Sequence, residues 1–245
     1  MSLRPIAGTP AALLGRNLLV SDLHLGIEFE MQRKGVRQPL DPAKTARELN
    51  ELASEHDANS LVVLGDFKHD VAGFEEREKK VVREFLSTLA MPVTVVKGNH
   101  DSMLENSPQL ALAPAEGLIL RDGRTRYGLF HGHAWPAPAL FKTSALLLGN
   151  LHPVFEFRDG MGGVYREKVW LSGKIALGAR NRQIAELKGV RKGQKFVVFP
   201  AYSNLVGGAA VNNWEEPRQI GPLFRHGLID FEKTGATMLN GVKVK

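Results

Sequence analysis

The feature that most constrains the fold is the alternation of short apolar runs with amphipathic segments in the first hundred residues. Strand-like apolar runs occupy 18–20, 61–64 and 92–96. Between them, Asp41 and Pro42 form an N-cap and first-turn pair that predicts a helix to about His56. The segment 74–89 carries the charged run EEREKK followed by spaced apolar residues, and it predicts a second helix. Such alternation is typical of a sheet with parallel strands, whose carboxyl ends meet at one edge.

After residue 117 the pattern becomes rich in strands. The predicted strands are 127–130, 145–148, 154–157, 164–171 and 196–199, with a turn at RDGMGG. A short helix is predicted within 176–188, and 223–231 is predicted to add an edge strand. No repeat or long linker divides the chain. We therefore predict an α/β fold, a layered α-β-β-α sandwich in a single domain over residues 1–245.

Composition excludes several classes of chemistry. The 245 residues include no cysteine, which excludes disulfides, thiolate zinc sites and cysteine nucleophiles. No apolar run approaches the roughly 20 residues of a membrane-spanning helix, and the first residues make a poor secretion signal. We therefore expect a soluble, cytoplasmic protein with no membrane partner.

Charge favours a polyanionic partner. Lys and Arg number 32 against 26 Asp and Glu, a net charge of +6. A basic cluster between 180 and 195 has two readings, a solvated face or a phosphate-binding surface. Its members are Arg180, Arg182, Lys188, Arg191, Lys192 and Lys195.

Polar residues of the types that bind metals follow successive predicted strands. They are Asp22, His24, Asp66, Asn99, His100, His131, His133, Asn150 and His152. Each alone has a simpler interpretation, because an Asp or Asn often caps a loop and a single His is usually a satisfied core or surface residue. The ordered set is different, since parallel strands deliver their loops to one edge of the sheet. The pattern predicts a metal site there.

These motifs resemble the calcineurin-like metallophosphoesterases. The resemblance rests on DLHLG, GDFKH, GNHD, HGH and GNLHP, in that order. They are most similar to the branch known as DNA ligase-associated or Lhr-helicase-associated metallophosphoesterases. The later FPAYSNLVGGAAVN is similar to that branch as well, so the motif-bearing core runs over about 18–213.

The resemblance implies a site with two divalent metal ions, with manganese favoured and iron, zinc or magnesium as alternatives. One metal is expected on Asp22, His24 and His152. Asp66 is expected to bridge to a second metal held also by Asn99 and His131. A hydroxide between the two ions would attack phosphorus, and His100 would donate a proton to the leaving oxygen. Asp101 is expected to pair with an imidazole that the sequence does not identify.

The chain departs from the family pattern at one ligand. The family has Gly-His-x-His where this chain has Gly149-Asn150-Leu151-His152. Asn150 could ligate through its amide oxygen, which is a weaker donor than imidazole for transition metals. His133 is a possible substitute, with substrate binding in the cleft or packing against Trp135 as the alternatives.

Three further residues are assigned to substrate contact. His69, three residues after Asp66, either orients His100 or contacts substrate. Asn204 and Asn212 are candidates by resemblance only.

The predicted function is a metal-dependent phosphodiesterase or nuclease that acts on nucleic acids or nucleotides, in DNA repair, with a helicase or DNA ligase as a possible partner. Two alternatives stay open. One is a nucleic-acid-binding accessory protein with a degenerate metal site. The other is a phosphomonoesterase of small metabolites. The sequence does not determine the oligomeric state.

Overall fold

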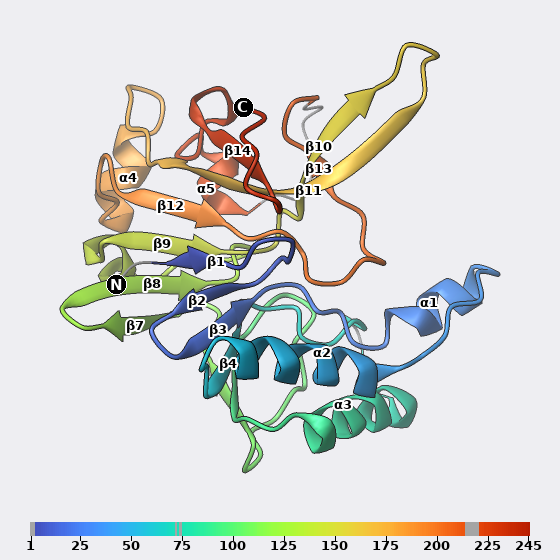
Figure 1. The fold of residues 1–245 in the computed structure, drawn as a ribbon. Coiled ribbons are helices and arrows are strands. Elements are labelled where there is room, and N and C mark those ends of the chain that lie inside the picture. Colours follow the sequence, from blue (N-terminus) through green and yellow to red (C-terminus); the bar gives the residue numbers. More distant parts are fainter. Residues whose placement is uncertain (1–2, 72, 74, 214–220) are drawn as a thin grey trace.

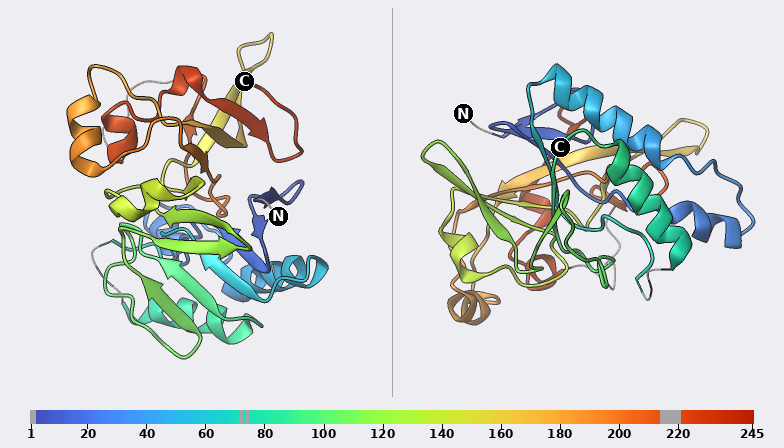
Figure 2. Two further views of the ribbon diagram at one scale, coloured as in Figure 1. Left: turned by 90° about the vertical axis from the view of Figure 1, so that its left-hand side faces the viewer. Right: turned by 90° about the horizontal axis from the view of Figure 1, so that it is seen from below.

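The computed structural model describes residues 3–71, 73, 75–213 and 221–245. Its strands form two sheets that pack face to face, with helices on the outer face of each (Figures 1 and 2). This is the predicted layered α/β sandwich. Phe74, the first residue of the helix predicted over 74–89, lies outside the described residues.

The first sheet has the order β1-β2-β3-β4-β5-β6. Its strands are β1 (Arg4–Pro5), β2 (Ala12–Leu14), β3 (Asn17–Val20), β4 (Ser60–Val63), β5 (Val93–Val96) and β6 (Leu110–Ala113). The last four run parallel, while β1 and β2 form an antiparallel edge. Because β3, β4 and β5 are parallel neighbours, the loops that follow them leave the same edge.

Three helices belong to this half of the chain, namely α1 (Ile27–Arg33), α2 (Pro42–Glu55) and α3 (Glu76–Thr88). The predicted N-cap of α2 is confirmed, because the Asp41 carboxylate accepts a hydrogen bond from Lys44 N at 2.8 Å. α2 and α3 cover the outer face of the first sheet (Figure 1). The sequence pattern does not predict α1, which buries only Ile27.

The second sheet has the order β13-β10-β11-β12-β9-β8-β7, and β14 also pairs with β11. Its strands are β7 (Leu118–Asp122), β8 (Thr125–Phe130), β9 (Ala145–Leu148), β10 (Pro153–Arg158), β11 (Val164–Lys174), β12 (Lys195–Val198), β13 (Ala209–Ala210) and β14 (Gly235–Met238). β8, β9 and β12 are parallel neighbours. The outer face is covered by α4 (Arg182–Lys188) and α5 (Pro222–Arg225), with 3-10 helices at Pro138–Lys142 and Phe231–Lys233.

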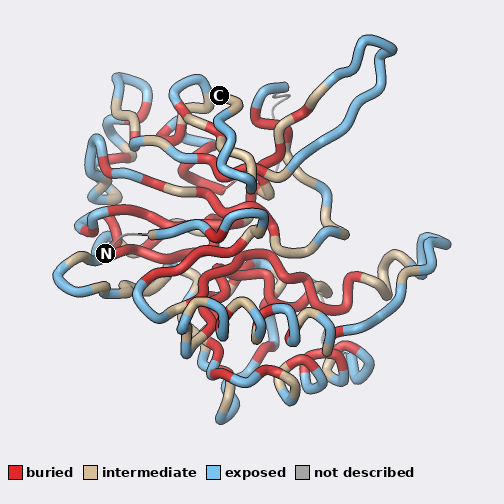
Figure 3. Tube along the Cα trace, in the orientation of Figure 1, coloured by how far each residue is buried: buried red, intermediate tan, exposed pale blue. Residues whose placement is uncertain are grey.

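The period of two in the strands divides the core into layers. In β3, Leu18 and Val20 pack beneath the helices, whereas Leu19 faces the second sheet. Figure 3 shows these central strands buried along their length and the β10–β11 hairpin exposed toward its tip. The central strands therefore form a rigid support for the loops at their carboxyl ends.

The predicted edge strand over 223–231 is wrong. Pro222 opens the short helix α5, and Gly227 has φ +64°, the left-handed conformation that ends a helix. The strand that pairs with β11 at this point is β14 instead. Among the described residues, no helix combines the length and apolar character that crossing a bilayer requires.

Candidate metal centre

Five parallel strands deliver the predicted site residues to one region between the two sheets. Asp22 and His24 follow β3, Asp66 follows β4, and Asn99 and His100 follow β5. The second sheet supplies His131 and His133 after β8, and Asn150 and His152 after β9.

Five of these residues have left-handed backbone, with φ of 48–68°. They are Asp22, His24, Asp66, Asn150 and His152. Residues other than glycine rarely adopt this backbone conformation. Its cost of about 1–3 kcal/mol per residue must be offset by the surrounding structure. The loops are therefore held in the shape that brings the side chains together.

Glycines allow the close approach of neighbouring loops. A Cβ on Gly65 would lie within 3.0 Å of the His131 ring, and one on Gly98 would lie equally close to Asp66. A Cβ on Gly149 would collide with Ser21 and approach Asp22 Oδ2 to 2.7 Å. Each of these glycines directly precedes a predicted ligand in the motifs GDFKH, GNHD and GNLHP.

Three groups of potential ligand atoms occur in the described chain, and within each group the atoms lie within 4.8 Å of one another. The groups are Asp22 with His24 and His152, Asp22 with Asp66 and His131, and His24 with His69 and His100. His152 Nε2 is 3.0 Å from Asp22 Oδ1. Asp66 Oδ2 lies 3.6 Å from His24 Nε2 and 3.3 Å from His131 Nε2. The Asp66 carboxylate therefore lies between the imidazoles that the sequence assigned to different metals.

The free nitrogens of these imidazoles fit divalent cations. His131 Nδ1 donates to Leu64 O at 2.7 Å, and His152 Nδ1 donates to Gly207 O at 2.9 Å. Their Nε2 atoms and that of His24 are buried and have no hydrogen-bond partner of acceptable geometry in the described chain. Metal-binding histidines have this arrangement, in which one nitrogen is fixed by a hydrogen bond and the other presents its lone pair.

The electrostatics of the cluster favour ionised carboxylates. Burial opposes ionisation of Asp22 and Asp66, but neighbouring imidazoles outweigh it and lower the pKa of both groups. Burial also opposes charge on His131, yet the Asp66 and Asp22 carboxylates raise its pKa to about 10. Burial lowers the pKa of His24 to about 3. Cations that bind here would displace the proton of His131, so binding releases protons.

His100 lies beside these groups. Its backbone N–H donates to Asp66 Oδ1 at 3.0 Å, its ring Nδ1 donates to His69 O, and its Nε2 is 3.8 Å from Asp66 Oδ2. The neighbouring Asp101 does not pair with an imidazole. Its carboxylate instead accepts from Phe67 N at 2.9 Å and Gly98 N at 2.8 Å, which ties the β4 and β5 loops together.

The two predicted amide ligands are less closely tied to the cluster. Asn99 is exposed, and within the described ranges its side chain makes no hydrogen bond. Asn150 is half-buried, and its backbone N–H donates to Asp22 Oδ2 at 3.3 Å. Asn150 thus supports the Asp22 carboxylate through its main chain.

The two predicted substrate-binding histidines pack on the cluster. The His133 ring lies 5.3 Å from that of His131, whereas Trp135 stacks on His226, so packing of His133 on Trp135 is not observed. The ring of His69 contacts His24, with 3.2 Å between their Nδ1 atoms.

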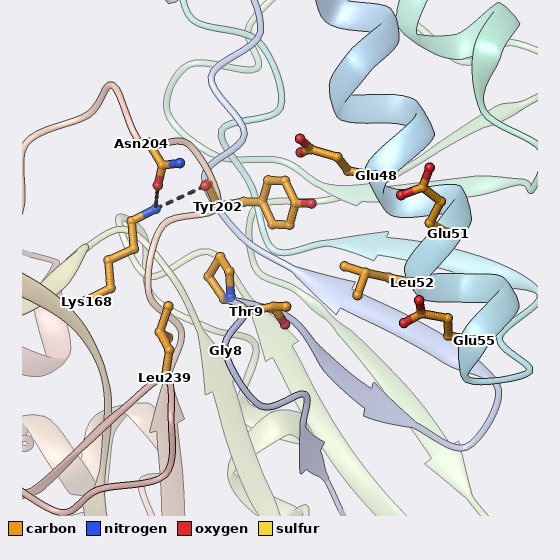
Figure 4. Close-up of a pocket in the computed structure, with 11 residues that line it drawn as sticks. Gly8, Thr9, Glu48, Glu51, Leu52, Glu55, Lys168, Tyr202, Asn204 and Leu239 are labelled. Atoms are coloured by element: carbon orange, nitrogen blue, oxygen red, sulfur yellow. Dashed lines mark hydrogen bonds between the residues drawn. The ribbon is translucent and has the colours of Figure 1, made fainter.

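A return loop after β12 closes one side of the site. Tyr202 N donates to Ser21 O at 2.8 Å, and Ser203 N donates to Asp22 O at 3.2 Å. Lys168 Nζ holds this loop through Tyr202 O at 3.1 Å and Asn204 Oδ1 at 2.7 Å, beside a cavity of about 360 Å³ (Figure 4). Burial lowers the pKa of Lys168 to about 8.

Neither asparagine that the resemblance assigned to substrate has a free side chain. The Asn204 amide oxygen accepts from Lys168, while Asn212 bonds both the N–H and the C=O of Glu156 at 2.8 Å. Both residues have structural partners.

The sequence and the fold of the chain are similar to those of known proteins. The family model of calcineurin-like phosphoesterases matches residues 16–205. A crystal structure of the Pseudomonas putida nuclease MPE shares the fold with a TM-score of 0.54, at 20% identity over 98% of both chains. A predicted phosphoesterase from Streptococcus pneumoniae gives a TM-score of 0.33, at 14% identity over 78% of this chain and 75% of that one. No curated protein sequence matches significantly. Because the family model matches more than half of its length, the chain belongs to the calcineurin-like phosphoesterases.

Proposed function

We propose that the protein hydrolyses phosphodiester bonds of nucleic acids or nucleotides in a reaction that depends on two divalent metal ions. The family makes it a hydrolase of phosphate esters. The observation that carries the proposal is the convergence of three buried imidazole Nε2 atoms, none with a hydrogen bond of acceptable geometry among the described residues, on two buried carboxylates.

The residues divide between two metal positions. Asp22, His24 and His152 would hold one ion, and His131 with Asp66 would hold the other, with Asp66 facing both. When bound, such ions activate water and neutralise charge on the phosphoryl oxygens. We propose manganese as the metal, because the carboxylate oxygens of the site are ligands that Mn²⁺ favours.

We propose His100 as the group that protonates the leaving oxygen. Its Nδ1 is fixed by His69 O, so Nε2 is the nitrogen turned toward Asp66 and the centre. The hydrogen bond from the His100 backbone N–H to Asp66 Oδ1 links the position of the His100 ring to that of the Asp66 carboxylate.

A nucleic-acid substrate is supported by the net charge of +6 and by the motif resemblance to the ligase- and helicase-associated branch. A neighbour in fold is described as a nuclease. A cytoplasmic role in DNA repair with a helicase or ligase partner remains a prediction from that resemblance.

The decisive experiment replaces Asp66 by Asn and measures hydrolysis of bis(p-nitrophenyl) phosphate with Mn²⁺. We expect turnover to fall by about 10²-fold or more, because the carboxylate between the two positions is lost. Asp57→Asn is the matched control, since Asp57 is exposed and has φ 54° against 51° for Asp66. Undiminished turnover by Asp66→Asn would refute the proposal.

The alternatives are separated by two further measurements. A higher rate on p-nitrophenyl phosphate than on the diester would indicate a phosphomonoesterase. DNA binding that weakens with salt, without cleavage under any metal, would indicate an accessory binding protein. The basic cluster is exposed or half-exposed around α4, which Figure 1 places at the amino ends of β9 and β12, away from the proposed metal centre.

A further inference from the structure

We propose that Glu30 and His69 form a positioning pair that fixes the tautomer and orientation of the His24 imidazole, so that His24 Nε2 presents its lone pair to a metal ion. The inference rests on the proposed function, because it concerns a residue assigned there as a ligand. Neither Glu30 nor α1, which carries it, was singled out by the sequence pattern.

A continuous chain of contacts connects the three side chains. Glu30 Oε2 is 2.6 Å from His69 Nε2, and His69 Nδ1 is 3.2 Å from His24 Nδ1. At the far end of the chain, His24 Nε2 is buried without a hydrogen-bond partner in the described residues, 3.6 Å from Asp66 Oδ2. The chain therefore runs from the surface helix α1 to the metal-facing nitrogen.

The direction of each hydrogen bond follows from the chemistry of the groups. An ionised carboxylate can only accept, so His69 Nε2 carries the proton. In neutral imidazole the other nitrogen is then an acceptor, which makes His24 Nδ1 the donor to His69 Nδ1. His24 Nε2 is consequently left unprotonated.

His24 is held differently from the other two imidazoles of the centre. His131 and His152 donate to main-chain carbonyl groups, at Leu64 and Gly207. His24 depends on side chains alone, and its last partner, Glu30, is about one-third exposed and also pairs with Lys34. The position of His24 can thus be altered without disturbing the core.

The backbone of His69 is fixed independently of its side chain. Its N–H donates to Leu25 O at 3.0 Å and also lies 3.0 Å from Glu78 Oε1. A substitution of the His69 side chain therefore leaves the loop in place, including the carbonyl group that accepts from His100.

The test combines tautomer measurement with metal affinity. In metal-free protein labelled with ¹⁵N-histidine, long-range ¹H–¹⁵N spectra report which nitrogen of His24 carries the proton. We expect Nδ1–H in the wild type and loss of that fixed tautomer in His69→Phe and Glu30→Ala. Titration with Mn²⁺ should show affinity reduced by about 10- to 100-fold at one of two sites in both variants, which is the usual effect of losing a partner of a metal-binding histidine.

Two further variants separate positioning from a general structural effect. His69→Gln retains an acceptor oxygen and a donor amide, and it should recover most of the affinity that His69→Phe loses. Lys34→Ala removes the other partner of Glu30 and should bind Mn²⁺ like the wild type. Each metal-free variant should still melt in one cooperative transition, which would show that a loss of Mn²⁺ affinity does not come from unfolding.

The inference would be overturned by Nε2–H at His24 in the wild type, or by unchanged Mn²⁺ affinity in both His69→Phe and Glu30→Ala. These results are distinct from failure of the proposed function, which would appear as a wild type that hydrolyses no diester. Because the tautomer is read without metal, it tests the positioning pair in either case.

Discussion

Replacement of Gly98 by Ala tests whether the approach of the β5 loop to Asp66 controls activity. A Cβ at this position would lie closer than 3.0 Å to Asp66 Oδ1 and Asp66 N, and at 3.0 Å from Asp66 Cγ, whereas ordinary contacts begin at 3.4 Å. The new Cβ and these Asp66 atoms must therefore move apart by more than 0.4 Å, the difference between 3.0 Å and 3.4 Å. Because one of the colliding atoms is a backbone nitrogen, the displacement cannot be absorbed by a rotamer change.

We expect Gly98→Ala to lower the free energy of unfolding by about 1–3 kcal/mol, as overpacking of a dense interior does. A displacement approaching 1 Å between Asp66 and His100 would reduce turnover by about 10²-fold. Hydrolysis of bis(p-nitrophenyl) phosphate with Mn²⁺ and urea denaturation measure the two effects. Gly178→Ala is the matched control, since a Cβ there meets nothing within 4 Å and the backbone is not left-handed. Wild-type turnover by Gly98→Ala would show that the close approach has no catalytic importance.

Three further predictions follow from individual side chains. Asp101→Ala should destabilise the protein by about 3 kcal/mol in urea denaturation, because buried backbone N–H groups lose a charged acceptor; a change below 0.5 kcal/mol would contradict this. Asn212→Ala should speed hydrogen exchange at the Glu156 amide, which loses its acceptor, and protection equal to the wild type would argue against it. Hydrogen bonds from Lys34 and His69 lower the pKa of Glu30 to about 2 from 4.5, so the stability that Glu30 contributes is complete above pH 4.5 and is lost as pH falls toward 2. Glu30→Gln should flatten that part of the melting-temperature profile, and an unchanged acid slope would count against the assignment.

Much of the central architecture follows from local sequence patterns. The runs that became β3, β4 and β5 are apolar on both faces because each is covered by helices on one side and by the second sheet on the other. The N-cap at Asp41 follows from the same local chemistry. In contrast, the apolar residues of 223–231 predicted a strand, and the structure has a helix there. Pro222 begins this helix, and the left-handed Gly227 follows its end.

For the site too, one part was predictable from local sequence and another part was not. Residue types after strand ends identified the group that meets between the sheets, because parallel strands necessarily share an edge. The partners of those residues were not predictable. Glu30 is a charged residue on a short helix, and nothing local distinguishes it from its neighbours, since its contact with His69 spans 39 residues. Asp101 was predicted to pair with an imidazole, but its carboxylate accepts from the Phe67 amide of the β4 loop, a partner that only the tertiary fold supplies.

The order of the strand ends along the chain has a consequence for biosynthesis. Asp22 and His24 leave the ribosome early, yet His152 and the Gly207 carbonyl that orients it are made more than 120 residues later. A nascent chain that ends before this point carries Asp22 and Asp66 without the complete set of imidazoles that lower their pKa in the folded protein. Assembly of the full centre must therefore come late in synthesis, after most of both sheets has emerged.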